Sequence, residues 1–185
     1  MIEKFVEWSK RNYTIRQKIL RFVPAGIFFL IGIPSASVYV SLFDSKLGLQ
    51  KFISEPQNYV LSLPLIFLGL ALSFWSVFVQ LRVGKGTPVP LAPTQRLITT
   101  GPYSLCRNPM ALGVMIYYFG ISLWLGSLTA LALSVLVLIL AIAYIKMVEE
   151  KELEARFGDE YRKYKSETPF LIPWQTLTKI LKIKK

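Results

Sequence analysis

Long stretches without charged side chains alternate with basic stretches along this chain. Asp, Glu, Lys and Arg are absent from residues 22–42, 56–81 and 108–145, which are 21, 26 and 38 residues long. An α-helix that crosses the ~30 Å bilayer core needs about 20 apolar residues, so the first two stretches predict one crossing each. The third would be about 57 Å long as one helix, and Gly126-Ser127 near its middle predicts a turn between two helices. The pattern predicts an all-α integral membrane protein with about four transmembrane helices.

The basic residues lie almost entirely on one predicted side of the membrane. Of the 22 Lys and Arg residues, 20 fall in segments 1–21, 82–107 and 146–185, and only Lys46 and Lys51 fall between the first two spans. The positive-inside rule therefore predicts that both termini are cytoplasmic. Membrane topology thus explains the net charge of +11, and cationic flanks suit anionic lipid headgroups. Membrane lipids are expected partners, and nucleic acid is not.

The whole chain, residues 1–185, is expected to form a single multi-pass domain. Residues 1–21 carry apolar side chains such as Phe5 and Trp8 among basic ones, which predicts an amphipathic helix on the membrane surface. A solvated leader packed on the bundle is the alternative. A cleavable leader is not expected, because the first apolar stretch is long enough to span the bilayer.

Two spans, a loop and a helical hairpin are predicted for the middle of the chain. The spans lie in residues 22–81, and Pro24 and Pro34 predict a kink in the first one. Residues 82–107 are rich in Gly and Pro without a sustained period, which predicts a loop, and loops of this length are usually functional or disordered. Residues 108–145 predict the hairpin.

Residues 146–185 predict a cytoplasmic helical segment. Gly158 is expected to divide its helix. Segment 169–173 is bounded by prolines and is expected to be extended, and the basic, apolar segment 176–185 suits the bilayer surface. Apolar side chains recur on one helical face of this segment: Leu153, Phe157, Tyr161 and Tyr164.

The residue types exclude several kinds of chemistry. Cys106 is the single cysteine, and the chain has no histidine. An internal disulfide, a zinc site and a His-based catalytic triad are therefore not expected, and no metal site is predicted.

A cationic side chain precedes the third apolar stretch. Arg107 is the last charge before it, and Asn108-Pro109 predict a helix start with Asn108 as the cap. Helix N-termini attract anions, so this start and Arg107 predict binding of a carboxylate or phosphate. An interfacial anchor that extends to the headgroups is the alternative role for Arg107.

Two acids follow the same stretch, and the four-span topology places them on the same membrane face as Arg107. Glu149 and Glu150 lie close to the bilayer, where acidic side chains are costly and often functional. The alternative is that they form the first solvated turn of a continuing helix. Glu152 is expected to lie on the solvated stretch beyond.

Two segments of the chain resemble the isoprenylcysteine carboxyl methyltransferase family: GPYSLCRNPMALG at 101–113 and EEKELEARFGDEYRKYKSETPFLIP at 149–173. Members of that family are integral membrane enzymes that use S-adenosylmethionine, and they are related to the phospholipid N-methyltransferases. The resemblance extends over about residues 84–173. It implies that S-adenosylmethionine is the cofactor, that loop 82–107 binds it and that segment 146–185 covers it. The implied cofactor-binding residues are Leu97, Ile98, Tyr103, Asn108, Pro109, Met110, Ala111 and Glu149.

Arg107 and Glu150 are the predicted catalytic residues. Arg107 and the helix start at Pro109 would hold the carboxylate of the donor. Glu149, Glu150 or Tyr103 would be available to help an amine acceptor lose its proton. The chain departs from the family at Ala111, where tyrosine is usual, and at Asn108, where histidine is common. Eukaryotic members carry an acceptor-binding arginine where this chain has Ile145, so the resemblance does not imply specificity for a carboxylate acceptor.

The expected function is S-adenosylmethionine-dependent methyl transfer to a lipophilic small molecule or a lipidated substrate at the cytoplasmic membrane face. Because the sulfonium already activates the methyl group, the protein would contribute positioning and electrostatics. N-methylation of a phospholipid or amino-lipid is one alternative. Another is a non-enzymatic membrane protein that binds a lipid or nucleotide with the same fold, and no pattern in the sequence predicts an oligomer.

Overall fold

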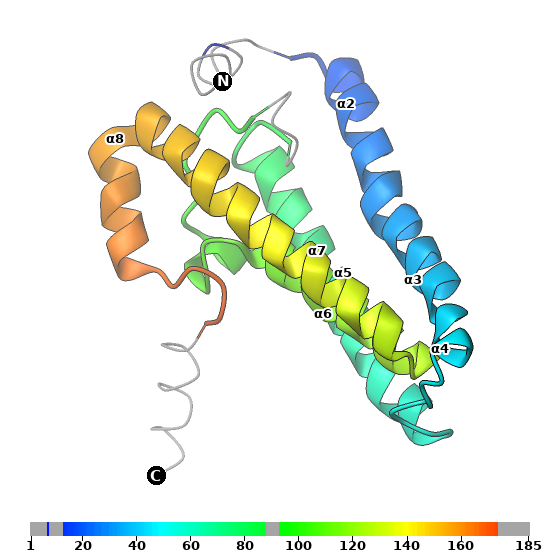
Figure 1. Cartoon of the computed structure of the whole chain (residues 1–185). Helices are drawn as coiled ribbons and strands as arrows, with labels where there is room; N and C mark the ends of the chain where they lie inside the picture. Colours follow the sequence, from blue (N-terminus) through cyan, green and yellow to red (C-terminus); the bar gives the residue numbers. More distant parts are fainter. Residues whose placement is uncertain (1–6, 8–12, 88–92, 174–185) are drawn as a thin grey trace.

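The computed structural model describes residue 7, residues 13–87 and residues 93–173, which form a bundle of apolar helices (Figure 1). The described residues contain no β-strand. Three helices are long and apolar enough to cross a membrane: Arg16–Lys46, Gln57–Arg82 and Leu128–Glu167. The prediction of an all-α integral membrane protein is therefore confirmed. The expected fourth span is a shorter apolar helix, Pro109–Leu125, of 17 residues.

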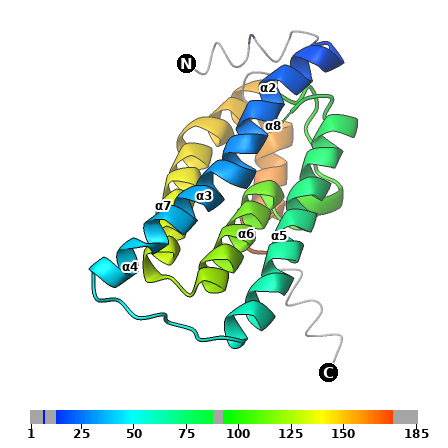
Figure 2. The same ribbon diagram turned by 90° about the vertical axis from the view of Figure 1, so that its right-hand side faces the viewer.

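The helices follow one another as antiparallel rods. The first rod combines α2 (Ile15–Ile27), the π-helical turn η1 (Phe28–Gly32), α3 (Ile33–Ser41) and the short α4 (Phe43–Lys46). The chain continues through α5 (Gln57–Arg82), the 3-10 turn η2 (Gly101–Ser104), α6 (Pro109–Leu125), α7 (Leu128–Tyr144), the π-helical turn η3 (Ile145–Glu149) and α8 (Glu150–Glu167). Figure 2 shows α3, α5, α6 and α7 side by side, with α6 between α5 and α7.

The first rod has a defined start at Thr14. The Thr14 side chain accepts a hydrogen bond from the Gln17 amide, and the Gln17 side chain accepts one from the Thr14 amide. This capping box satisfies N–H groups that a helix start leaves free. Residues 15–21 therefore form the first turns of a helical rod that continues to Lys46, so the helix expected to end at residue 21 runs on into the first span. Residues 1–6 and 8–12 lie outside the described part of the chain.

The kink predicted from Pro24 and Pro34 takes the form of the turn η1. The Ile33 amide donates to the carbonyl of Phe28, five residues earlier, instead of four. Pro34 has no N–H to donate at all. The carbonyl groups of residues 29 and 30 therefore lose their usual helical donors.

Two tyrosines of α6 supply the missing donors. Tyr118 Oη donates to the Phe29 carbonyl at 2.8 Å, and Tyr117 Oη donates to the Leu30 carbonyl at 3.1 Å. Backbone groups inside a membrane protein must find internal partners, because lipid offers none. These bonds therefore attach the first rod to α6 at its bend.

Small residues allow α5 and α6 to pack closely. A Cβ added at Gly69 would lie 2.5 Å from the Tyr117 amide nitrogen and 2.6 Å from the Gly113 carbonyl oxygen. One added at Gly113 would lie 2.5 Å from Ser73 Oγ. Small residues at a helix interface let two backbones approach, which is the main source of packing energy between membrane helices.

The turn predicted at Gly126-Ser127 is confirmed. Gly126 ends α6 with a φ of +62°, a conformation that glycine adopts without strain. Ser127 begins α7, and its Oγ accepts a hydrogen bond from the Ala130 amide at 3.1 Å. Farther along the hairpin, the hydroxyl groups of Ser122 and Ser134 lie 2.9 Å apart and join α6 to α7.

The last apolar helix does not end at the membrane edge. From α7 it runs through η3 into α8, so the acids at 149 and 150 lie within a continuous helical path. Gly158 then breaks the path with φ 52° and ψ −125°, as predicted, and the second half of α8 turns back along the bundle (Figure 1). Segment 169–173 is non-helical, and residues 174–185 lie outside the described part.

Candidate functional site

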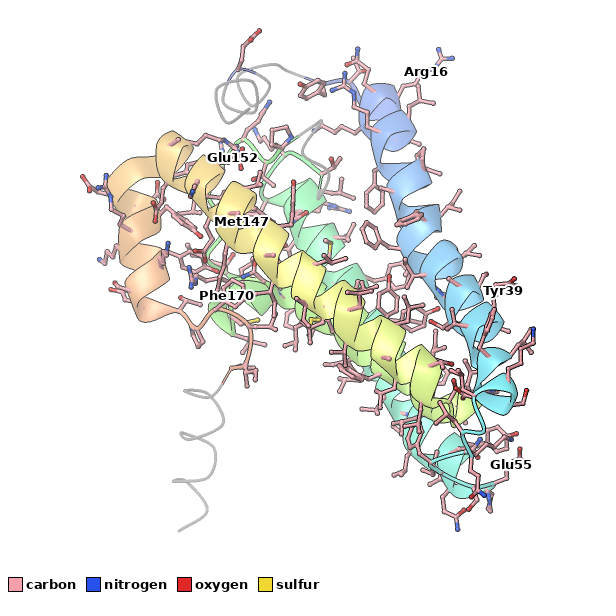
Figure 3. All side chains as sticks on the ribbon, in the orientation of Figure 1. Arg16, Tyr39, Glu55, Met147, Glu152 and Phe170 are labelled. Carbon is pink, nitrogen blue, oxygen red and sulfur yellow. The ribbon has the colours of Figure 1, made fainter. Side chains whose placement is uncertain are left out.

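A cavity of about 60 Å³ lies at one end of the bundle, where the segment after residue 93 meets η3 and α8. Glu152 and Phe170 lie toward this end, and Glu55 lies at the other (Figure 3). Seven of the ten predicted site residues line it: Leu97, Ile98, Tyr103, Arg107, Asn108, Glu149 and Glu150. Ligand sites usually enclose several hundred Å³, so the walls must part before a ligand of nucleoside size can bind.

The three remaining predicted residues are not part of the cavity wall. Pro109, Met110 and Ala111 form the first turn of α6, immediately after Asn108. The structure thus brings residues 97–108 and the acids at 149 and 150 to one cavity, and Asn108 is the last residue before α6 that lines it.

The two residues predicted to be catalytic, Arg107 and Glu150, form an ion pair. Arg107 Nη1 lies 2.6 Å from Glu150 Oε1, and the side chains are 11% and 10% exposed. The other oxygen of Glu150 lies 3.0 Å from Lys165 Nζ, and Lys165 also contacts Glu154 at 2.9 Å. Glu150 therefore pairs with two cations, and both of its carboxylate oxygens are engaged. Arg107 keeps one buried donor, Nε, without a partner among the described residues.

Glu149 differs from Glu150, because it has no ion-pair partner among the described residues. It lines the cavity, and no other described residue forms a hydrogen bond or an ion pair with it. Its near charges are the carboxylates of Glu150 and Glu152. An open carboxylate beside two others is complementary to a cation or to hydroxyl donors.

Tyr103 is buried in the cavity wall, and two hydrogen bonds hold it in place. Its phenol oxygen accepts a hydrogen bond from Gln80 Nε2 at 2.5 Å, and its carbonyl accepts one from Tyr164 Oη at 2.6 Å. Burial raises the pKa of Tyr103 well above its usual value, and the negative charge of Glu149 adds to that rise. The phenol therefore stays protonated and acts as a donor, not as a base.

The strap formed by Pro169 and Phe170 orders the residues before α6. The Arg107 amide donates to the Pro169 carbonyl at 2.8 Å, and Asn108 Nδ2 donates to the Phe170 carbonyl at 2.9 Å. The Arg107 guanidinium and the Lys146 ammonium lie 5.6 and 5.1 Å from the centre of the Phe170 ring. Asn108 precedes α6 as predicted, but its side chain bonds this strap and does not cap the helix.

Glu152 is not solvated, contrary to the sequence expectation. It is 7% exposed and pairs with Arg156, whose guanidinium also donates to the Thr94 carbonyl. The reason is the path of the chain: α8 crosses the segment that follows residue 93, so its inward face is covered. This contact ties α8 to the cavity wall at Thr94.

Sequence reasoning did not assign several wall residues. Leu153, Tyr161 and Tyr164 were recognised only as an apolar helical face, and Ile145 only as a departure from the family. Gln80 and Thr94 were missed. The one available signal was that Gln80 is the single amide side chain in residues 59–81 of an otherwise apolar span.

Comparisons with known proteins identify the family of this chain. The family model for phospholipid methyltransferase matches residues 57–160. Methanethiol S-methyltransferase 1 of Bradyrhizobium diazoefficiens is 28% identical over 137 residues, which are 66% of this chain and 45% of that relative. This chain thus spans less than half of the relative's length, and no solved structure matches. Because the family match covers more than half of the chain, including η2, α6, η3 and most of the cavity wall, the chain belongs to the phospholipid methyltransferase family.

Proposed function

We propose that this protein is a membrane methyltransferase that takes its methyl group from S-adenosylmethionine and transfers it to a lipophilic acceptor at the cytoplasmic membrane face. The observation that carries the proposal is Glu149, an unpaired carboxylate on the wall of a cavity in a chain of the phospholipid methyltransferase family. Glu149 is half-buried, and a carboxylate that is partly removed from water without a partner is costly to a protein, which favours a ligand that pairs with it.

The unpaired polar atoms of the cavity suit this donor. Gln80 Oε1 is a buried acceptor and Arg107 Nε is a buried donor, and neither has a partner in the described part of the chain. S-adenosylmethionine carries an ammonium, hydroxyl groups and an exocyclic amine that donate, and a carboxylate that accepts. Glu149 would hold the ammonium or a ribose hydroxyl, and Arg107 would hold the carboxylate.

The sulfonium of the donor supplies an activated methyl group, so this chain need not provide a nucleophile. Its residues would bind, orient and exclude water. Tyr103 donates into the cavity from a rigid position, because Gln80 and Tyr164 hold it on both sides. Leu97, Ile98 and Leu153 give the wall an apolar part that keeps water out.

The charges of the cavity favour an acceptor without a carboxylate. Arg107 is the single cationic side chain among the described wall residues; it pairs with Glu150, and its remaining donor, Nε, is the one assigned above to the carboxylate of the methyl donor. An acceptor carboxylate would therefore find no free cation and would lie near Glu149. An amine or a thiol would find in Glu149 a carboxylate that can take its proton. This observation favours N-methylation of an amino-lipid as the second candidate, and the named relative acts on methanethiol.

The acceptor would reach the site from the bilayer. Phe74, Trp75 and Phe78 are half exposed on the last turns of α5, near the turn that carries Tyr103. A Cβ on Gly101, which begins that turn, would lie 3.9 Å from the Trp75 ring. These rings form a lipid-facing wall beside the cavity, which suits a lipophilic acceptor that enters from the side.

The test is methyl transfer by the full-length protein in lipid nanodiscs. Methyl-labelled S-adenosylmethionine is supplied with a farnesylated cysteine, phosphatidylethanolamine, a long-chain thiol or total membrane lipids. We expect label in one lipophilic product and its loss when S-adenosylhomocysteine is added as a competitor. Absence of any labelled product above the protein-free control, despite saturating donor, would contradict the enzymatic proposal and favour a binding scaffold.

A further inference from the structure

Basic side chains lie on two elements that meet at the cavity end of the bundle, the start of the first rod and the end of α5. Arg16, Lys18, Arg82 and Lys85 form this α2–α5 basic surface, and Figure 3 labels Arg16 at the start of the rod. The Lys18 ammonium donates to the Lys85 carbonyl at 2.6 Å and joins the two elements. Within the described part of the chain, none of the four forms an ion pair with a carboxylate. Their charges are therefore available to an external anion.

Lys85 has a backbone conformation that a lysine adopts only with strain. Its φ is +54°, in the left-handed region that few residues other than glycine occupy. The loop is fixed by close contacts on both sides of Lys85. A Cβ on Gly84 would lie 2.7 Å from Ile98 Cδ1, and a Cβ on Gly86 would lie 2.4 Å from the Thr94 backbone. A glycine at position 85 would fit this loop without strain, so the charge of the exposed lysine side chain explains its presence better than the fold does.

Apolar surface begins directly beside these cations. On α2, large apolar side chains are exposed: Ile19, Leu20, Val23 and Ile27. On α5, the Arg82 guanidinium lies 5.0 Å from the centre of the Phe78 ring, which is also exposed. A phospholipid with a net negative headgroup has the same division, because its charged phosphate is joined to apolar chains.

The first rod is bound to the bundle mainly from its bend onwards. The Phe29 and Leu30 carbonyls accept hydrogen bonds from two α6 tyrosines, and the Val40 carbonyl accepts one from Thr129 Oγ1 at 2.8 Å. Before the bend, Lys18 reaches the loop after α5. A ligand that contacts both α2 and the end of α5 would therefore stabilise the part of the rod that has fewer partners.

We propose that the α2–α5 basic surface binds an anionic phospholipid, which links the first rod to the end of α5. The headgroup phosphate would lie among the four cations, and the acyl chains would lie along the exposed side of α2. Basic sites between membrane helices favour anionic headgroups in this way. None of the four residues lines the cavity, so this site does not depend on the proposed methyl transfer.

Charge and shape together favour a lipid over other occupants. A second copy of this chain would bring the same four positive charges to the surface and would be repelled. A soluble anion would pair with the cations but would leave the apolar side chains of α2 uncovered. A phosphatidylcholine headgroup carries an ammonium beside its phosphate, which reduces its attraction to a basic surface.

Native mass spectrometry of the full-length protein in a neutral detergent tests the site. Dioleoylphosphatidylglycerol is titrated in, and the Kd of the first bound lipid is measured. Arg82→Gln and Lys85→Gly each remove one charge from the site, and Lys151→Gln removes one from the exposed surface of α8 as the matched control. We expect each site variant to raise the Kd about fivefold, the contribution of one basic residue near an anionic lipid surface. The control should bind like wild type, and dioleoylphosphatidylcholine should bind more weakly.

Thermal unfolding separates the role of Lys85 in lipid binding from a role in folding. Without lipid, Lys85→Gly should melt no lower than wild type, because glycine removes the strain at this position. The rise in melting temperature on adding dioleoylphosphatidylglycerol should shrink in this variant. A lower lipid-free melting temperature together with an unchanged Kd would show that Lys85 serves the fold, and would contradict the proposal.

Three other results would overturn the site. Equal Kd values for wild type, Arg82→Gln and Lys85→Gly would show that these cations do not bind the lipid. An equal loss in Lys151→Gln would show a general attraction to the basic end of the protein. Displacement of the lipid by glycerol phosphate at equal concentration would identify a site for soluble anions.

Discussion

Glu149 and Glu150 are neighbours in sequence, yet they do different work. Glu150 points to Arg107 and Lys165 and closes a buried ion network. Glu149 points to the cavity and has no described partner. Successive helical residues differ by about 100° in direction, so one acid can hold the structure together while the next faces a ligand. A pair of acids is therefore two separate hypotheses, a structural one for Glu150 and a binding one for Glu149.

The ion network predicts unequal stability losses. Glu150→Leu leaves the buried Arg107 guanidinium without its carboxylate, and removing one partner of a buried pair costs about 3–5 kcal/mol. Lys165→Met removes a cation that is 36% exposed, so solvent compensates and the loss should stay below about 1 kcal/mol. Unfolding in mixed detergent micelles measures both changes. Equal losses would show that Arg107 does not depend on Glu150.

Two features hold the helices together: the backbones of α5 and α6 approach closely, and side chains donate hydrogen bonds to carbonyl groups that have lost their helical donors. Gly69 and Gly113 bring α5 and α6 together, and this contact positions the end of α5 that carries Gln80. At the bend of the first rod, two α6 tyrosines replace helical donors. The shape of the cavity therefore depends on contacts well inside the bundle.

Two glycine substitutions test the close packing of α5 and α6. Gly69→Ala forces a methyl group against the backbone of α6 and should lower the free energy of unfolding by about 1–3 kcal/mol. Gly26→Ala is the matched control, because no atom lies within 4 Å of its added Cβ. Helical propensity then favours alanine by up to about 1 kcal/mol. Thermal unfolding of both variants gives the comparison, and equal melting temperatures would contradict the packing.

The exposed rings at the end of α5 predict a selective kinetic effect. Trp75 is 48% exposed near the cavity, so Trp75→Ala should raise the KM for a lipid acceptor and leave donor affinity and melting temperature unchanged. Trp124, 42% exposed beyond the far end of this helix, is the matched control, and Trp124→Ala should not change that KM. If Trp75→Ala weakens donor binding and stability along with acceptor kinetics, Trp75 is a packing residue.

Helices, turns and breaks could be predicted from the sequence, because neighbouring residues determine them. Contacts between residues far apart in the sequence could not be predicted. Uncharged length predicted the helices, and Gly126 and Gly158 predicted a turn and a break, because glycine adopts positive φ angles with little strain. The start at Ile15 also had a local signal, the Thr14–Gln17 capping box, which amphipathic periodicity outweighed. Gln80 and Tyr103 are 23 residues apart and meet only when the loop folds over α5. No local pattern could place them together.

At the scale of the whole molecule, the two ends of the bundle differ in charge. Lys18 Nζ donates to the Lys85 carbonyl at 2.6 Å, so the start of the first rod and the loop after α5 lie at one end. Figure 1 shows α8 at the same end. Of the 15 basic residues that the structure describes, 13 fall in residues 16–21, 82–87, 93–107 and 146–173. The expected orientation places this end in the cytoplasm.

Single cysteines test this orientation without first removing the native one. Burial raises the pKa of the Cys106 thiol, so it should not react with a membrane-impermeant maleimide. Ser45 and Ser166 are exposed at opposite ends. In sealed cells, Ser45→Cys should be labelled from outside, and Ser166→Cys only after permeabilisation. The reverse pattern would invert the topology.

The central claim is that the cavity beside Glu149 binds the methyl donor, and calorimetry of S-adenosylmethionine with the protein in nanodiscs tests it most directly. Glu149→Gln keeps the shape and removes the charge, so the binding free energy should weaken by about 1.5–3 kcal/mol, as for one charge-assisted hydrogen bond. Glu160→Gln, on the exposed side of α8, should bind like wild type. Saturable binding that Glu149→Gln weakens and Glu160→Gln does not is the predicted result. Equal affinity of wild type and Glu149→Gln would contradict the claim.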